Sequence, residues 1–284
     1  MSPPLDLPAD LPADLPADPP AYVEVGPTDG PPVLFLHGIG GGKACFAGPA
    51  EALAASGLRC LCWDMPGYGD SPPLPGRPGM TALAGAAGAL LDHLGLPGVH
   101  LVGHSIGGMI ALELLAQQPG RVLSLVLYAA PPAFGGRDPE VARGFLADRL
   151  APLEAGQGMA ELADSLVPGM VGPSADPAGV ATAVSTMSGV PEAGYRMALG
   201  ALDGFDRRPL LDHITVPTLV IGGGCDPNTP RSTLARLAAR IPGARLKVIE
   251  RAGHLAHLEH PDAFTEALVD FLAPSPVPTP SRQP

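Results

Sequence analysis

Short apolar runs alternate with longer amphipathic segments along most of the chain. The apolar runs predict strands at Tyr22–Val25, Val33–Leu36, Leu58–Trp63, Val99–Val102, Val122–Tyr128, Val216–Ile221 and Leu246–Glu250. The segments between them predict helices at Ala47–Ser56, Thr81–Leu94, Ile106–Gln118, Ser232–Ile241 and Asp262–Leu272. Strands without polar alternation, separated by helices, are typical of an α/β fold. We therefore predict a mostly parallel central sheet with helices on both faces.

One long stretch contains no predicted strand. Between residues 131 and 208, glycines and prolines separate four helix-like segments, Pro139–Leu150, Met159–Leu166, Ala178–Met187 and Glu192–Leu202. An insertion of this size above a parallel sheet is typical of a lid over a binding crevice. We predict a helical cap at 131–208 and a core formed by 21–130 and 209–273. The abundance of Ala, Leu, Met and Gly in the cap favours a small to medium apolar substrate.

Glycine and proline are unusually frequent, with 37 residues of each. Many prolines fall at the two ends of the chain, where the motif Leu-Pro-Ala-Asp occurs three times between Leu7 and Asp18. A proline in every fourth position removes helix hydrogen bonds. The sequence therefore predicts disordered tails at 1–20 and 274–284.

The formal net charge is −11, which argues against a nucleic-acid or anionic-membrane partner, because both favour a basic surface. The N-terminus is acidic and proline-rich, unlike a signal peptide. Four cysteines give no disulfide framework in a chain of this size, and none has neighbours at metal-ligand spacing. Cys60 and Cys62 alternate with Leu61, so we expect them to share one buried face. These features predict a cytoplasmic protein without a metal.

The strongest local motif is Gly103-His-Ser105-Ile-Gly107. It matches Gly-x-Ser-x-Gly between a predicted strand and a predicted helix. In that context a sharp turn exposes the serine hydroxyl at the N-terminus of the helix, where developing negative charge is stabilised. Ser105 is therefore the candidate nucleophile.

A serine nucleophile needs a general base and an orienting acid. Asp226 and His254 each follow a predicted strand and so fall in loops facing the same crevice. The order Ser105, Asp226, His254 matches that of this strand–turn–helix architecture. His257 and His260 are rival bases that we interpret as part of a solvated cap. Asp203 and Asp206 are alternative acids.

Acyl transfer also requires donors for the oxyanion. The glycine-rich run after Leu36 supplies a flexible backbone, and we predict that the N–H groups of Ile39 and Ile106 form the oxyanion hole. Substrate contacts are expected at His37, Gly38, His104 and Met187, although His37 is also suited to local hydrogen bonding. The run lacks the phosphate-binding and dinucleotide fingerprints, so no cofactor is expected.

Several of these motifs together resemble the α/β-hydrolase fold family. They are His37-Gly38-x-Gly40, Asp64-Met-Pro-Gly67-Tyr-Gly69-Asp-Ser71, Gly103-His-Ser105-Ile-Gly107-Gly108, Asp226 and Gly253-His254. The segment from Asp206 to Gly223 and the run from His254 to Pro261 are similar to 3-oxoadipate enol-lactonases and related esterases. This resemblance implies an α/β-hydrolase that acts on a small-molecule ester or lactone.

Other branches of the family remain open. Enol-lactonases usually carry Arg where Pro66 stands, and the segment from Asp64 to Ser71 is more similar to C–C bond hydrolases. Those usually carry Asn at the position of His104 and an aromatic residue at that of Leu255, whereas the Asp nucleophile of epoxide hydrolases is excluded by Ser105. We predict a serine hydrolase that forms an acyl-enzyme on a carboxylic ester or lactone. The alternatives are a C–C bond hydrolase of a vinylogous diketone and a non-catalytic ligand-binding relative.

Overall fold

A computed structural model of the protein describes residues 18–135 and 139–273. Seven strands in these residues form one sheet in the order β1-β3-β2-β4-β5-β6-β7. The strands are β1 (Tyr22–Val25), β2 (Pro32–Leu36), β3 (Arg59–Trp63), β4 (Val99–His104), β5 (Val122–Tyr128), β6 (Thr218–Gly223) and β7 (Arg245–Ile249). Only the β1–β3 pair is antiparallel among these strands, which confirms the predicted mostly parallel sheet. Of the predicted tails, residues 1–17 and 274–284 lie outside the described residues.

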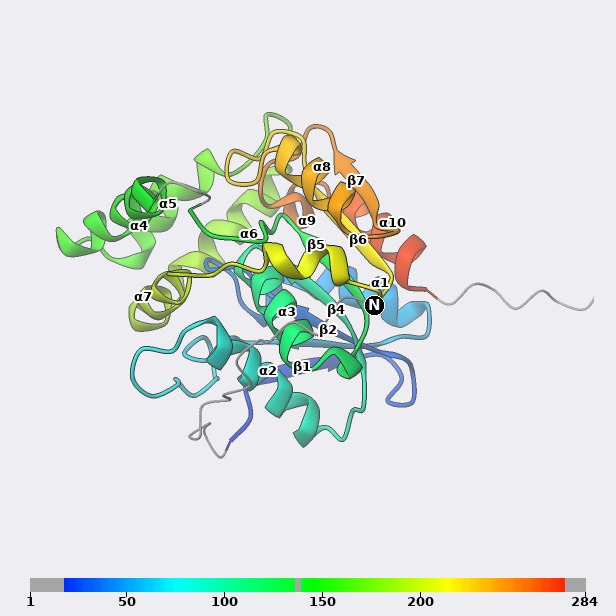
Figure 1. The fold of residues 1–284 in the computed structure, drawn as a ribbon. Helices are drawn as coiled ribbons and strands as arrows, with labels where there is room; N and C mark the ends of the chain where they lie inside the picture. Colours follow the sequence, from blue (N-terminus) through cyan, green and yellow to red (C-terminus); the bar gives the residue numbers. More distant parts are fainter. Residues whose placement is uncertain (1–17, 136–138, 274–284) are drawn as a thin grey trace, which may run out of the picture.

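Each face of the sheet has its own hydrophobic core, because successive side chains of a strand point to opposite faces. Leu34 and Leu36 pack on the face covered by α2 (Met80–His93), α3 (Ile106–Gln117) and α8 (Arg231–Arg240). Val33 and Phe35 pack on the other face, under α1 (Ala47–Ala55) and α10 (Pro261–Leu272) (Figure 1). Cys60 and Cys62 are buried together on this second face, as their spacing predicted.

The strand register brings the carboxyl ends of the central strands to one edge. Leu36 of β2 lies beside Gly103 of β4, and His104 lies beside Tyr128 of β5. Tyr128 in turn lies beside Ile221 of β6. The loops that follow these strands therefore meet above a single edge of the sheet, where parallel α/β folds bind their ligands.

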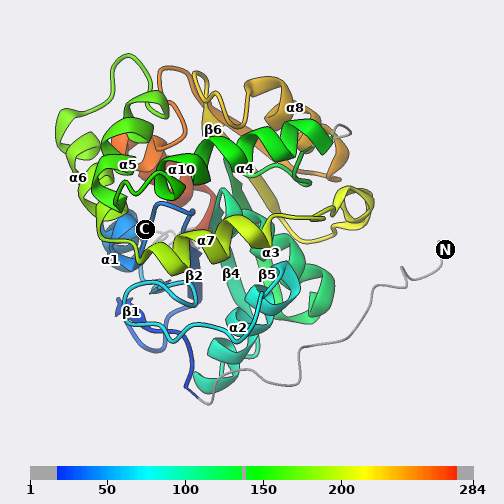
Figure 2. The same ribbon diagram turned by 90° about the vertical axis from the view of Figure 1, so that its left-hand side faces the viewer.

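The insertion after β5 is helical, as predicted. It contains α4 (Pro139–Glu154), α5 (Met159–Leu166), the short 3₁₀ helix η3 (Val167–Gly169), α6 (Pro177–Ser188) and α7 (Glu192–Ala201). A bridge between Ala133 and Asp206 closes its base, where the Phe134 N–H donates to the Phe205 carbonyl at 3.0 Å. Helices α4–α7 group on one side of the molecule and face the viewer in Figure 2. We call this insertion the cap.

Several element boundaries differ from the sequence prediction. Helix α4 continues four residues beyond Leu150 and contains Pro152 inside it. The short helix α9 (Ala256–Glu259) was not predicted as a separate element, because four residues are too few for a periodic pattern. No helix within the described residues has both the length and the apolar character needed to cross a lipid bilayer.

Candidate active site

Ser105 occupies a strained turn between β4 and α3. Its backbone angles are φ 54° and ψ −118°, a region that residues other than glycine rarely adopt. Its N–H donates to the carbonyl of Tyr128 at 2.8 Å, which fixes the turn to the neighbouring strand. Such strain persists only where surrounding contacts impose it, and it is characteristic of functional sites.

The glycines around Ser105 are required by close packing. A Cβ atom on Gly103 would overlap the backbone of Gly107, and one on Gly107 would overlap the carbonyl of Leu36. The added Cβ of Gly38 would lie 2.7 Å from Nδ1 of His104 and 3.5 Å from Cβ of Ser105. The glycine-rich loop after β2 therefore lies directly against the nucleophile turn, as the oxyanion prediction requires.

Asp226 and His254 form a buried pair at the same edge of the sheet. Nδ1 of His254 donates to Oδ2 of Asp226 at 2.7 Å, and both residues are about as buried as the core. The other carboxylate oxygen accepts the N–H groups of Asn228 at 2.8 Å and Thr229 at 3.1 Å. With Nδ1 as the donor, Nε2 of His254 carries a lone pair that can accept a proton.

The two groups that would exchange a proton are both available. Within residues 18–135 and 139–273, neither the Ser105 hydroxyl nor Nε2 of His254 has a hydrogen-bond partner. Ser105 and His254 line the same cavity, and hydrogen bonds of this kind are often long before substrate binds. The rival acids lie elsewhere: Asp203 is exposed, and Asp206 binds the guanidinium of Arg208.

A second carboxylate, Glu259, holds the loop that carries His254. Glu259 is 2% exposed and accepts the N–H groups of Gly253 at 2.8 Å, Leu255 at 2.9 Å and, from the cap, Gly172 at 2.6 Å. The N–H of His254 donates to the carbonyl of Met170, also in the cap, at 2.7 Å. The position of the candidate base is therefore linked directly to the cap. The sequence analysis missed this role, because it rests on backbone contacts between distant segments.

His257 is not part of a solvated cap, and this prediction was wrong. The residue is 3% exposed, and its Nδ1 lies 3.0 Å from the hydroxyl of Tyr128, which is also 3.0 Å from the carbonyl of His254. The position after a helix-like run suggested exposure, but α9 turns this side chain into the core. Neither His257 nor the half-buried His260 contacts a carboxylate in the described part of the chain.

His37 and His104 shape the site through hydrogen bonds within the protein. Nε2 of His37 accepts the N–H of Met65 at 2.9 Å, so its Nδ1 must donate to the carbonyl of Gly38 at 2.8 Å. Nε2 of His104 lies 3.0 Å from the carbonyl of His254, and its ring stacks on Tyr128. His37 has no free ring nitrogen, so it can contribute surface to the cavity but no hydrogen bond to a substrate.

Burial keeps these histidines neutral, and this predicts acid-sensitive stability. Desolvation lowers the pKa of His37 to about 4 and that of His257 to about 3, and it lowers the pKa of His104 as well. The unfolded chain, with histidine pKa values near ~6.5, binds protons first as the pH falls. The contribution of these histidines to the free energy of unfolding is therefore fully present above pH ~6.5. It is lost as the pH falls from there toward the pKa values of the folded state.

We expect each of these histidines to lower the free energy of unfolding by about 1.4 kcal/mol per pH unit below pH ~6.5. Urea unfolding at pH 7.5, 6.0 and 5.0 measures the slope. The variant His257→Gln should show a shallower slope than the wild-type chain. An unchanged slope in that variant would contradict the assignment of His257 as a neutral buried group.

The two proposed oxyanion donors lie beside the nucleophile turn. Ile106 is the first residue of α3, where an N–H has no partner within the helix. No hydrogen bond of the described residues engages the N–H of Ile39 either, and its carbonyl accepts the hydroxyl of Tyr68 at 2.9 Å. The Ile39 carbonyl is therefore held by Tyr68, while both N–H groups stay available.

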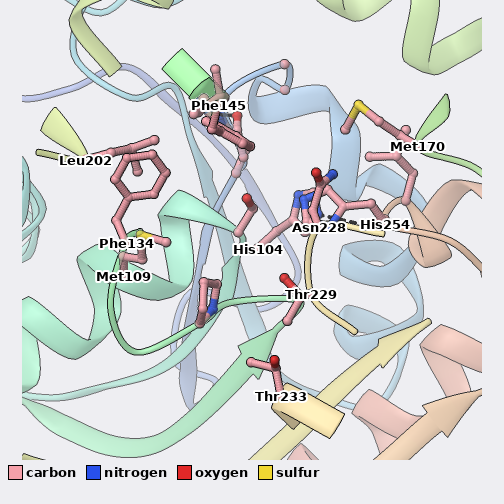
Figure 3. Close-up of a pocket in the computed structure, with 18 of the residues that line it drawn as sticks. His104, Met109, Phe134, Phe145, Met170, Leu202, Asn228, Thr229, Thr233 and His254 are labelled. Atoms are coloured by element: carbon pink, nitrogen blue, oxygen red, sulfur yellow. Dashed lines mark hydrogen bonds between the residues drawn. The ribbon is translucent and has the colours of Figure 1, made fainter. Parts of the chain in front are cut away.

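A cavity of about 900 Å³ lies between this edge of the sheet and the cap. Ser105 and His254 line it, together with four expected contact residues, His37, Gly38, His104 and Met187. Figure 3 shows Met109, Phe134 and Leu202 gathered on one side of the cavity, with Asn228 and His254 on the other. The cavity thus has an apolar wall facing a side that carries polar groups, with Met170 close to His254.

Comparison with known proteins places this arrangement in a family. Residues 31–261 match the model of the alpha/beta hydrolase fold. The chain is 32% identical over 260 residues to the dihydrolipoyllysine-residue acetyltransferase component of the acetoin cleaving system of Pseudomonas putida; the match covers 88% of this chain and 66% of that protein, slightly under two thirds.

Two further relatives are hydrolases by name. The pimeloyl-[acyl-carrier protein] methyl ester esterase of Aeromonas salmonicida is 29% identical, with 86% of this chain and 96% of the relative covered. The 2-hydroxy-6-oxononadienedioate/2-hydroxy-6-oxononatrienedioate hydrolase of Cupriavidus pinatubonensis is 31% identical, with 84% and 86% covered.

A solved structure agrees with these relatives. The enol-lactonase of Burkholderia xenovorans LB400 superimposes with a TM-score of 0.79 at 28% identity, covering 89% of this chain and 96% of that one. The sheet order, the cap and the matched residues therefore lead to one conclusion: the chain belongs to the α/β-hydrolase fold family.

Proposed function

We propose that the protein is a serine hydrolase that cleaves a carboxylic ester or lactone through an acyl-enzyme. The observation that carries this proposal is the 2.7 Å bond from Nδ1 of His254 to Asp226, in the cavity that the strained Ser105 also lines. A nucleophile, a base and an orienting acid in one site are the requirements of acyl transfer. The esterase and enol-lactonase relatives support the same reaction class.

The proposed reaction has two halves. Oγ of Ser105 attacks the substrate carbonyl carbon while Nε2 of His254 takes the hydroxyl proton, and Asp226 stabilises the resulting imidazolium. The N–H groups of Ile39 and Ile106 stabilise the oxyanion, and loss of one such donor typically lowers turnover by ~10²–10³. The imidazolium then protonates the leaving alkoxide. In the second half water replaces serine as the attacking group, with the same proton path, and releases the acid.

Serine-directed labelling tests the proposal. The full chain is incubated with a fluorophosphonate probe, and the adduct is located by mass spectrometry, with heat-denatured protein as the control. We expect one adduct, on Ser105, together with hydrolysis of p-nitrophenyl acetate. Absence of an adduct, or an adduct on a different serine, would exclude this mechanism and favour a non-catalytic ligand-binding relative.

C–C bond hydrolysis is the second candidate. The pattern from Asp64 to Ser71 favours it, as does the oxononadienedioate hydrolase among the relatives. A panel of an enol-lactone, simple alkyl esters and a vinylogous diketone, compared by kcat/KM, separates the two reactions. The ester or lactone proposal requires the diketone to be the poorest substrate.

A further inference from the structure

The cavity has a positive lining in an otherwise acidic protein. Among the described residues, four arginines and no Asp or Glu line it, although the chain has a formal net charge of −11. The arginines are Arg149 of α4, Arg208 of the 3₁₀ helix η4 (Arg208–His213), and Arg236 and Arg240 of α8. The lining therefore combines apolar cap side chains with positive charge, a feature that the small to medium apolar substrate expected from the cap composition does not account for.

Two of these arginines form ion pairs with carboxylates, and within the described residues the other two do not. Arg208 binds Asp206, and Arg240 binds Asp212. Within the described ranges, neither Arg149 nor Arg236 has a carboxylate at ion-pair distance. Arg236 is exposed and donates to the hydroxyl of Thr233 at 3.0 Å, so water solvates its charge at the rim of the cavity.

Arg149 is half-buried and incompletely bonded. Its guanidinium lies 3.4 Å from the ring centroid of Phe145, and its two hydrogen bonds are long: 3.3 Å to the Phe145 carbonyl and 3.4 Å to Oδ1 of Asn228. Desolvation lowers the pKa of Arg149, while electrostatic interactions with Tyr195 and with the neighbouring Asp148, which forms no ion pair with it, act in the opposite direction. A guanidinium has five N–H donors, so most of those on Arg149 remain free for a ligand.

The position of Arg149 connects it to the proposed reaction site. It contacts Asn228, whose N–H binds the same Asp226 carboxylate that holds His254. Figure 3 shows Asn228 beside His254, with Phe134 and Leu202 on the apolar side of the cavity. A substrate bound here would place an apolar segment against that side and a charged end at the guanidinium.

We propose that Arg149 binds a carboxylate carried by the substrate, so that the preferred substrates are esters or lactones of acids with a second, free carboxylate. A planar guanidinium pairs with a carboxylate through two parallel hydrogen bonds. One half-buried positive charge without an ion pair in the described residues also matches one carboxylate better than a doubly charged phosphate. Arg236 attracts the same anion from the rim. This inference rests on the proposed ester or lactone hydrolysis.

A matched pair of substrates tests the inference. Monomethyl adipate and methyl hexanoate have the same chain length and differ in the terminal carboxylate. We expect the wild-type chain to prefer monomethyl adipate. In Arg149→Gln, kcat/KM for monomethyl adipate should fall at least about tenfold, mainly through KM, while that for methyl hexanoate changes little. Arg143→Gln, an exposed position on the same helix that does not line the cavity, is the control and should behave as wild type.

Equal losses on both substrates would show that Arg149 only supports the fold of the cap and would overturn the inference. Stronger competitive inhibition by inorganic phosphate than by adipate would assign the site to phosphate and also overturn it. Calorimetric binding of monomethyl adipate to Ser105→Ala, compared with Ser105→Ala/Arg149→Gln, needs no turnover. Weaker binding by the double variant would support the carboxylate site even if the wild-type chain hydrolysed neither ester, which would count against the proposed function alone.

Discussion

Replacing Ser105 with Ala is expected to lower kcat for p-nitrophenyl acetate by about 10⁶-fold, because removal of a serine nucleophile abolishes the covalent route. The variant should fold normally. Alanine is as strained as serine at φ 54°, and the Ser105 hydroxyl makes no hydrogen bond within the described residues. The melting temperature of Ser105→Ala should therefore stay close to that of the wild-type chain.

The control for this variant is Ser56→Ala. Ser56 follows α1 and does not line the cavity. Its hydroxyl donates to the carbonyl of Ala52, so loss of this hydroxyl should leave kcat unchanged. Steady-state kinetics of both variants gives the comparison. Residual activity of Ser105→Ala near the wild-type level would mean that another group attacks the substrate.

The second large effect is expected from Asp226→Asn, a drop in kcat of about 10⁴-fold. An Asn side chain can still accept the N–H groups of Asn228 and Thr229, so the loop should keep its shape. Its amide would present a donor to Nδ1 of His254 and force the proton onto Nε2. Nε2 could then no longer accept the serine proton, so the base would be held in the wrong tautomer.

Asp203→Asn and Asp206→Asn are the comparison variants, because the sequence analysis names both residues as alternatives to Asp226 for the acid that orients the base. Asp203 is exposed, and Asp206 is bound to Arg208, so neither replacement should approach the loss seen with Asp226→Asn. All three variants are compared by kcat on one ester at one pH. A variant of Asp203 or Asp206 with the larger loss would transfer the orienting role to that residue.

The main features of the fold could be predicted from the sequence because they depend on local patterns. Apolar runs of strand length, such as Val33–Leu36 and Val122–Tyr128, are confirmed within a residue at each end. The strand–turn–helix context around Ser105 is likewise local, and the structure has the expected sharp turn there, with a positive φ at Ser105. Parallel strands place Asp226 and His254 in loops at one edge of the sheet. There Nδ1 of His254 donates a hydrogen bond to Asp226.

Features that depend on contacts between distant segments could not be predicted in this way. The burial of His257 against Tyr128 and the binding of Gly172 by Glu259 join positions 129 and 87 residues apart. A charged residue of α4 looks solvated in the sequence, and its contact with Asn228, 79 residues away, shows that Arg149 lies in the cavity wall.

The sequence by itself thus determined the α/β architecture and the candidate nucleophile, base and acid, because strand periodicity and turn chemistry are encoded within a few neighbouring residues. The tertiary structure decided which histidines are buried, how Glu259 links the cap to the loop of His254, and which half-buried arginine lines the cavity without an ion pair. The physical reason is that burial and charge pairing belong to surfaces that exist only after distant segments have packed together.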